Sequence, residues 1–258
     1  MSRDRRLIRT ITDFRKYYRQ LGAGDAVIGP LALRPAEEIK LLDLMDRGVA
    51  CFPGVLAQVL SRSKAGQAEV LGEFMVPGTF VAYVLADLAA QLPDFHSRTE
   101  GQVVTKRDRA NLGLGVSLWP SLEVLYSLAA LSGLPYPLVV QPLVPEARDL
   151  RVVVLGDYLE AYERLNPHSF RKNLFQGGSA APFTLNSEQS QFCRRVMARG
   201  RFPYAILDLL FAPQGQVYLS EINLKGGLTG ARLNQGEFKQ RLATLEEDFR
   251  RQWESSKR

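Results

Sequence analysis

Two carboxylates and an amide lie close together near the C-terminal end of the sequence. Residues 205–211 and 216–222 are apolar segments joined by Ala-Pro-Gln-Gly, a pattern typical of a β-hairpin. Glu221 and Asn223 are two residues apart, so on a strand their side chains share a face, and Asp208 lies on the opposing strand. Such an all-oxygen set suits Mg²⁺. Alone, it is equally typical of polar residues that form hydrogen bonds at strand ends.

A lysine at the end of a predicted strand could bind phosphate. Lys106 ends the strand that begins at Val103, and a loop of small residues with Gly113 and Gly115 follows it. The ammonium group would supply a positive charge, and the N–H groups of the loop would supply hydrogen-bond donors. A solvent-exposed lysine before a turn has the same pattern. This motif therefore indicates a phosphate site only in combination with other motifs.

The remaining polar motifs occur in a defined order. Ser-Arg-Ser-Lys64 comes first, and Gln141-Pro-Leu-Val leads to the strand that carries Arg151. The sequence Phe-Arg-Lys-Asn-Leu-Phe-Gln-Gly-Gly at 170–178 precedes the hairpin with the carboxylates. In this order the motifs resemble the ATP-grasp superfamily, and most closely its ribosomal-protein glutamate ligase (RimK-like) branch, from about residue 61 to residue 230.

The resemblance implies a site for ATP. Two lysines would hold the phosphates, a glycine-containing loop would close over them, a hinge segment would bind adenine through its backbone, and an acid would lie on the nucleotide side. The implied nucleotide-binding residues are Lys64, Lys106, Gly113, Gly115, Gln141, Pro142, Leu143, Val144 and Asp149.

The resemblance also implies the reacting centre. Arg151 would face the γ-phosphate and an acyl phosphate, and Arg171 and Asn173 would lie in the loop over that centre. The implied metal ligands are Asp208, Glu221 and Asn223, with Mg²⁺ as the expected ion and Mn²⁺ as an alternative.

The sequence departs from the family pattern at several positions. Pro142 replaces a common Glu, and Ala110 replaces a loop glycine. Lys225 adds a cation after Asn223 that could contact a substrate carboxylate or phosphate, although a solvated lysine is the alternative. His168 is a second candidate substrate contact, with a surface loop histidine as the alternative. The region before Lys64 is shorter than the usual preceding domain.

Hydrophobic periodicity and turn residues predict both helices and strands. The spacing of Leu7, Ile11, Phe14, Tyr18 and Leu21 predicts an amphipathic helix that ends at Gly22. The other predicted helices cover 36–47, 55–73, 121–132, 187–199 and 235–255, and the predicted strands cover 25–29, 49–52, 103–104, 138–140, 150–155, 158–162 and the later hairpin.

The expected fold is therefore α+β or mixed α/β, and the resemblance makes it an ATP-grasp fold of two lobes that clasp ATP. Residues 1–60 form a basic helix and a shortened βαβ-like segment. Residues 61–140 form the small lid lobe, and residues 141–258 form the large lobe with the metal site and a C-terminal helix.

The implied activity is that of an ATP-dependent carboxylate–amine ligase, which forms an amide through an acyl phosphate. Its partners would be a small-molecule or peptide carboxylate and an amine. No Ser/His/Asp or Cys/His arrangement is needed for this reaction. Two alternatives remain: an ATP-grasp kinase that phosphorylates a small molecule, and a non-catalytic nucleotide-binding or interaction protein.

The net charge of +6 is concentrated at the N-terminus, where residues 1–20 hold seven basic and two acidic side chains. A solvated helix face explains this charge, and an acidic partner or a lipid surface is the alternative. The sequence has no apolar run of membrane-spanning length, no signal-peptide pattern and only two distant cysteines. We expect a cytoplasmic protein without a transmembrane segment, and a homo-oligomer is compatible with the sequence.

Overall fold

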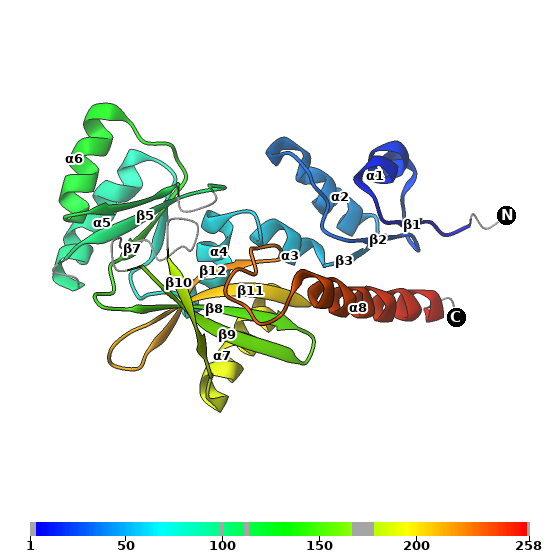
Figure 1. Ribbon diagram of the computed structural model, residues 1–258. Helices are drawn as coiled ribbons and strands as arrows, with labels where there is room; N and C mark the ends of the chain where they lie inside the picture. The colour runs from blue at the N-terminus through cyan, green and yellow to red at the C-terminus, as the bar shows by residue number, and fades with distance from the viewer. Residues whose placement is uncertain (1–3, 99–100, 111–113, 167–177, 257–258) are drawn as a thin grey trace.

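The computed structural model describes residues 4–98, 101–110, 114–166 and 178–256. Helices surround three separate sheets, so the predicted mixed α/β class is confirmed. The N-terminal sheet lies at one end of the molecule, a four-stranded sheet lies at the other, and a five-stranded sheet lies between them (Figure 1).

The five-stranded sheet holds the largest hydrophobic core. All of its neighbouring strands are antiparallel. The helices α3, α4 and α7 pack their buried apolar residues into this core, because they carry their apolar side chains on one face. The strands in order across the sheet are β10 (Ser179–Phe183), β9 (Tyr158–Leu165), β8 (Arg148–Leu155), β11 (Tyr204–Phe211) and β12 (Val217–Asn223), and the helices are α3 (Val55–Leu60), α4 (Lys64–Leu71) and α7 (Ser187–Gly200).

The four-stranded sheet has a core of its own with two helices. Its central strands are fully or mostly buried, whereas its outer strands are short. The strands in order are β4 (Phe80–Ala82), β7 (Leu138–Pro142), β5 (Val103–Arg107) and β6 (Val116–Trp119), and the helices are α5 (Leu85–Arg98) and α6 (Leu122–Ser132).

The N-terminal segment forms a small parallel sheet with a third core. Short 3-10 segments at Tyr18–Gln20 and Pro35–Glu37 lie after its first helix and before its second, and a third at Gly72–Phe74 follows α4. Its strands are β1 (Leu7–Ile8), β2 (Ala26–Ile28) and β3 (Ala50–Phe52), and its helices are α1 (Ile11–Tyr17) and α2 (Ile39–Asp46).

Two helix predictions were wrong in their extent. The first predicted helix starts later, because Leu7–Ile8 pairs with β2 as a strand and Thr10 caps α1. The predicted helix over 55–73 is broken between α3 and α4, where the Ser63 side chain accepts a hydrogen bond from the Gly66 N–H and starts a new helix. The break places Lys64 at the first position of α4.

The hydrophobic cores do not follow the expected division of the chain. Residues 57–75 pack into the core of the five-stranded sheet, and strand β7 spans residues on both sides of the expected boundary at 140. The lobes as defined by residues 61–140 and 141–258 remain a prediction. The strands β1, β4, β6 and β10 were not predicted, because each is short and its apolar residues lack a clear period.

The C-terminal helix α8 (Gln235–Ser255) runs from the five-stranded sheet towards the N-terminal segment (Figure 1). The Trp253 indole N–H donates to the Gly24 carbonyl at 2.9 Å, and the Arg5 guanidinium lies 4.4 Å from the Trp253 ring centre. Arg9 also lies 3.5 Å from Glu246 of α8. Part of the basic N-terminal charge therefore stabilises the contact between the two ends of the chain. Among the described helices, none is both long and apolar enough to cross a membrane.

We expect Trp253→Ala to lower the free energy of unfolding by about 2 kcal/mol, because it removes an aromatic contact and a hydrogen bond. Urea denaturation followed by circular dichroism measures this change. Trp253→Phe keeps the ring and should lose less. An unchanged urea midpoint in the alanine variant would show that the two ends of the chain do not depend on this contact.

Candidate active site

A cavity of about 810 Å³ lies where residues of the five-stranded and four-stranded sheets meet the segment that follows β2. Strands β8, β9, β11 and β12 supply most of its charged side chains, α4 supplies Lys64, and β5 and β7 supply Lys106 and Gln141. The segment after β2 adds an apolar wall at 30–33. Most of the predicted site residues that the structure describes line this one cavity.

Three charged residues form a row across the five-stranded sheet. Arg151 of β8 is the register partner of Asp208 on β11, and Asp208 is the register partner of Glu221 on β12. Side chains in register on neighbouring strands share a face of the sheet and lie close together. The topology therefore brings together residues that are separated by up to 70 positions in the sequence.

Asp208 is held between two arginines. Its carboxylate accepts hydrogen bonds from Arg151 Nε at 2.8 Å and Nη2 at 2.9 Å, and Arg164 Nη2 lies 3.1 Å from Oδ2. Burial alone would raise the pKa of the Asp208 carboxyl, but the two guanidinium groups outweigh it and lower the pKa. Asp208 is therefore ionised at neutral pH.

Arg164 is a site residue that the sequence analysis missed. It is buried, and its Nε donates to Asp149 Oδ1 at 2.6 Å. Burial raises the pKa of the Asp149 carboxyl, although Arg164 acts in the opposite direction. The signal was present in the sequence: the predicted turn at Gly156 sets the hairpin register, and that register pairs Asp149 with Arg164.

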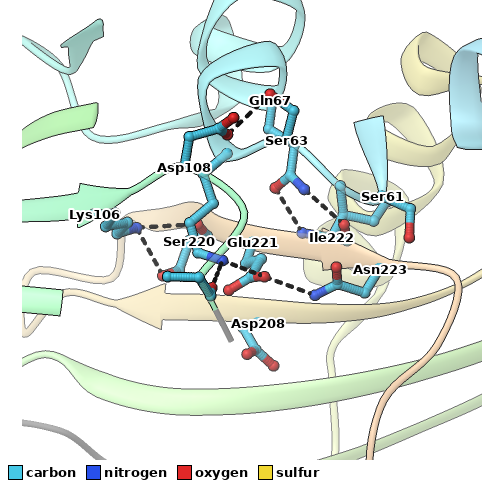
Figure 2. A network of polar contacts seen from close by, with 12 residues as sticks. Ser61, Ser63, Gln67, Lys106, Asp108, Asp208, Ser220, Glu221, Ile222 and Asn223 are labelled. Atoms are coloured by element: carbon cyan, nitrogen blue, oxygen red, sulfur yellow. Dashed lines mark hydrogen bonds and ion pairs between the residues drawn. The ribbon is translucent and has the colours of Figure 1, made fainter. Parts of the chain in front are cut away.

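Lys64 reaches the carboxylate at the end of this row. Its Nζ lies 2.9 Å from Glu221 Oε1 and donates to the Ala110 carbonyl at 2.8 Å. Asn223 Nδ2 donates to the same Glu221 oxygen at 3.0 Å (Figure 2). Lys64 thus links the α4 N-terminus, the loop after β5 and the end of β12.

Lys106 is buried between two strands of different sheets. Its Nζ donates to Gln141 Oε1 at 2.9 Å and to the Ser220 carbonyl and hydroxyl oxygens at 3.0 and 3.1 Å (Figure 2). Burial lowers the pKa of the Lys106 ammonium to about 8, although Glu221 raises it. Its hydrogen-bond partners, Gln141 and Ser220, are neutral, so none of them neutralises its positive charge directly. That charge can attract an anion in the cavity.

The loop after β5 is held close to the cavity. Asp108 Oδ1 accepts hydrogen bonds from the Ser63 hydroxyl at 3.0 Å and from the Ala65 N–H at 3.1 Å. A β-carbon at Gly115 would lie 2.4 Å from Cβ of Ala110, so this position requires glycine. The role of Gly115 in a nucleotide-binding loop remains a prediction, and Gly113 lies outside the described residues.

The other predicted positions divide into three groups. Leu143, Val144 and Lys225 line the cavity, and Lys225 is exposed. Pro142 is buried but does not line the cavity, because it follows Gln141 on β7 and successive strand residues point to opposite faces. The remaining predictions, His168, Arg171 and Asn173, fall outside the described residues.

The donor set at the end of β12 fits a magnesium ion. Asp208 and Glu221 supply carboxylates and Asn223 supplies an amide oxygen, which are ligands that Mg²⁺ accepts. Among the described residues, no group of three or more His, Cys, Asp and Glu side chains is close enough to hold a metal ion. Both carboxylates are paired with cations, so a bound metal ion would have to replace part of this pairing.

The comparisons with known proteins agree with this geometry. Solved structures of ATP-grasp ligases share the fold: the D-alanine–D-alanine ligase from Coxiella burnetii superposes with a TM-score of 0.61 at 16% identity, covering 90% of this chain and 70% of its own. A complex of the ATP-grasp ligase PsnB with a minimal precursor, Mg and ADP gives 0.61 at 14% identity, covering 95% of this chain and 99% of its own. The fold is therefore the ATP-grasp fold.

Residues 58–243 match the model of the RimK-like ATP-grasp domain, and the chain belongs to this family. A probable alpha-L-glutamate ligase from Sodalis glossinidius is 32% identical over 133 residues, which are 50% of this chain and 45% of the relative. A probable alpha-L-glutamate ligase from Haemophilus ducreyi is 31% identical over 180 residues, which are 66% of this chain and 57% of the relative. The chain thus spans about half the length of the curated relatives it matches.

We expect the affinity for ATP to fall as the pH rises through about 8, because the protonated form of Lys106 is the form that attracts phosphate and its pKa lies there. An ordinary lysine would keep its charge to a pH near 10. Isothermal titration calorimetry between pH 7 and pH 10 measures the dissociation constant. Lys106→Arg keeps its charge throughout and should remove most of this dependence, so the same pH profile in both proteins would contradict the assignment.

Proposed function

We propose that this protein is an ATP- and Mg²⁺-dependent carboxylate–amine ligase. One observation carries the proposal: a single cavity joins Lys64 and Lys106 to the row of Arg151, Asp208 and Glu221. Two cations that can hold phosphate thus lie beside carboxylates that can hold a metal ion. The proposal includes a cytoplasmic location, where ATP is available.

The chemistry that fits this site needs no protein nucleophile. The substrate carboxylate attacks the γ-phosphorus of ATP, the bond to the β-phosphate oxygen breaks, and ADP and an acyl phosphate form. An amine then attacks the acyl carbon, phosphate leaves, and the amine loses a proton as the amide forms. Charge neutralisation and positioning carry such a phosphoryl transfer, and Lys64, Lys106 and Arg151 are the residues that supply them here.

The metal ion would supply further neutralisation of the phosphate charge when it is bound. Asp208, Glu221 and Asn223 are the residues proposed to hold it. Arg151 already donates to Asp208 and to the Gly227 carbonyl, so its guanidinium group is held beside one of the proposed metal ligands. Release of Lys64 from Glu221 would free a carboxylate for the metal ion and a cation for phosphate in one exchange.

The relatives indicate which substrates to test first. Several are named as probable alpha-L-glutamate ligases, so L-glutamate is the first amine. PsnB has been solved with a precursor peptide, so peptides with free carboxylates are the first acids. Lys225 lines the same cavity and is proposed to contact an anionic group of one of these substrates.

The decisive experiment measures ADP formation by the purified protein with ATP, Mg²⁺, a panel of carboxylates and L-glutamate. A ligase forms ADP only with a suitable acid, releases phosphate and yields an amide that mass spectrometry detects. A stable phosphorylated product without an amide would instead support the kinase alternative. ATP binding without any turnover across the panel would support a non-catalytic role.

We expect Glu221→Ala and Asn223→Ala each to lower the rate of ADP formation by on the order of 100-fold, because each removes a proposed metal ligand. Steady-state kinetics at saturating ATP and varied Mg²⁺ measures this loss. Glu188→Ala, at an exposed position in the first turn of α7, is the matched control and should leave the rate unchanged. Full activity in both site variants would overturn the metal assignment.

A further inference from the structure

Glu38 joins three parts of the molecule that are distant in sequence. It belongs to the N-terminal segment, immediately before α2, and its side chain is only 11% exposed. Its two carboxylate oxygens accept hydrogen bonds from Arg109 Nη1 at 2.6 Å and Nη2 at 2.7 Å. A bidentate pair of this kind fixes orientation as well as distance. The N-terminal segment is therefore tied directly to the loop that follows β5.

Arg109 is built into that loop by an unusual backbone conformation. Its φ angle of 57° lies in the left-handed region, which non-glycine residues adopt at a cost. The residues on either side of it contact the α4 N-terminus: Asp108 accepts from Ser63 and Ala65, and the Ala110 carbonyl accepts from Lys64. The side chain of Arg109 reaches Glu38, and its Nε also lies 3.3 Å from Asp108 Oδ2. Residues 108–110 therefore contact both the α4 N-terminus and the N-terminal segment.

Arg62 connects the same carboxylate to the cavity. It lies in the turn between α3 and α4, and its Nη1 is 3.7 Å from Glu38 Oε1. Its Nη2 donates to the carbonyl of Leu31, which belongs to the apolar wall of the cavity. Burial lowers the pKa of the Arg62 guanidinium, while Glu38 raises it. The negative charge of Glu38 thus compensates the positive charges of Arg62, beside the cavity wall, and Arg109, in the loop.

We propose that Glu38 is a positioning residue that holds residues 108–110, directly after β5, beside the cavity through Arg109. The inference rests on the proposed function only in taking this cavity as the nucleotide site. Glu38 does not line the cavity itself. It acts by holding Arg109, and through the adjoining backbone it fixes the Ala110 carbonyl that Lys64 contacts. The N-terminal segment therefore helps to fix the backbone of residues 108–110 beside the cavity.

The first test needs no ligand. In the full-length protein without ATP, Glu38→Gln should speed hydrogen exchange at the Arg107 and Ala110 amides, which bond to the Gly115 and Arg107 carbonyls. We expect roughly a fivefold increase, measured by NMR or mass spectrometry, because local opening of the loop becomes easier. Arg109→Gln should have the same effect. Buried amides of β8 should keep their exchange rates, which separates a local effect from a general loss of stability.

A double-mutant cycle tests whether the two residues act as one unit. If they do, the variant with both Glu38→Gln and Arg109→Gln should open the loop no more than either single variant. Glu37→Gln is the matched control, because the neighbouring Glu37 pairs with Lys40 at 2.9 Å and Arg15 at 3.4 Å at the surface and does not contact the loop. It should leave the exchange rates unchanged.

The same variants should release a fluorescent ATP analogue roughly fivefold faster in stopped-flow experiments, while Glu37→Gln does not. Unchanged exchange in Glu38→Gln, fully additive effects in the cycle, or an equal effect of Glu37→Gln would overturn the proposal. If the wild-type protein forms no ADP but Glu38→Gln still speeds hydrogen exchange at these amides, the proposed function would be overturned and the role of Glu38 would remain supported. Normal ADP formation with unchanged exchange would overturn the role of Glu38 alone.

Discussion

The site depends on the pairing of buried charges. A carboxylate removed from water is costly unless a cation and hydrogen bonds compensate it. Asp208 meets this requirement with two arginines, and Glu221 meets it with Lys64. The same groups are those that phosphate and a metal ion would need. Without ligands, the site is thus stabilised by contacts between its own binding groups.

This pairing has a consequence for ligand binding. A metal ion that binds alone would leave the arginines and Lys64 without their carboxylates, and a nucleotide that binds alone would leave the carboxylates without their cations. The two ligands together satisfy both sets. If the proposed function holds, ATP and Mg²⁺ would bind jointly, since each ligand would reduce the cost of binding the other.

The five-stranded sheet, the four-stranded sheet and the N-terminal segment each supply different groups of this site. The five-stranded sheet presents the charged row on one face, and the four-stranded sheet brings Lys106 against Ser220 of β12. The N-terminal segment supplies the apolar wall and, through Glu38, a contact to the loop after β5. C-terminal helix α8 in turn holds the N-terminal segment through Trp253, so distant parts of the chain contribute to the cavity.

The order of the polar motifs indicated the ATP-grasp class through its resemblance to a known family. Local period, turn residues and strand alternation, which act over a few residues, determined the two hairpins, most long helices and the strand positions of Asp208, Glu221 and Asn223. The tertiary structure decided which of these elements meet. It brought Arg164 of β9 against Asp208 of β11, and Lys64 at the start of α4 against Glu221 of β12. It also joined Glu38 to Arg109 across 71 positions, because ion pairs form between residues that folding brings together and no sequence spacing records that distance.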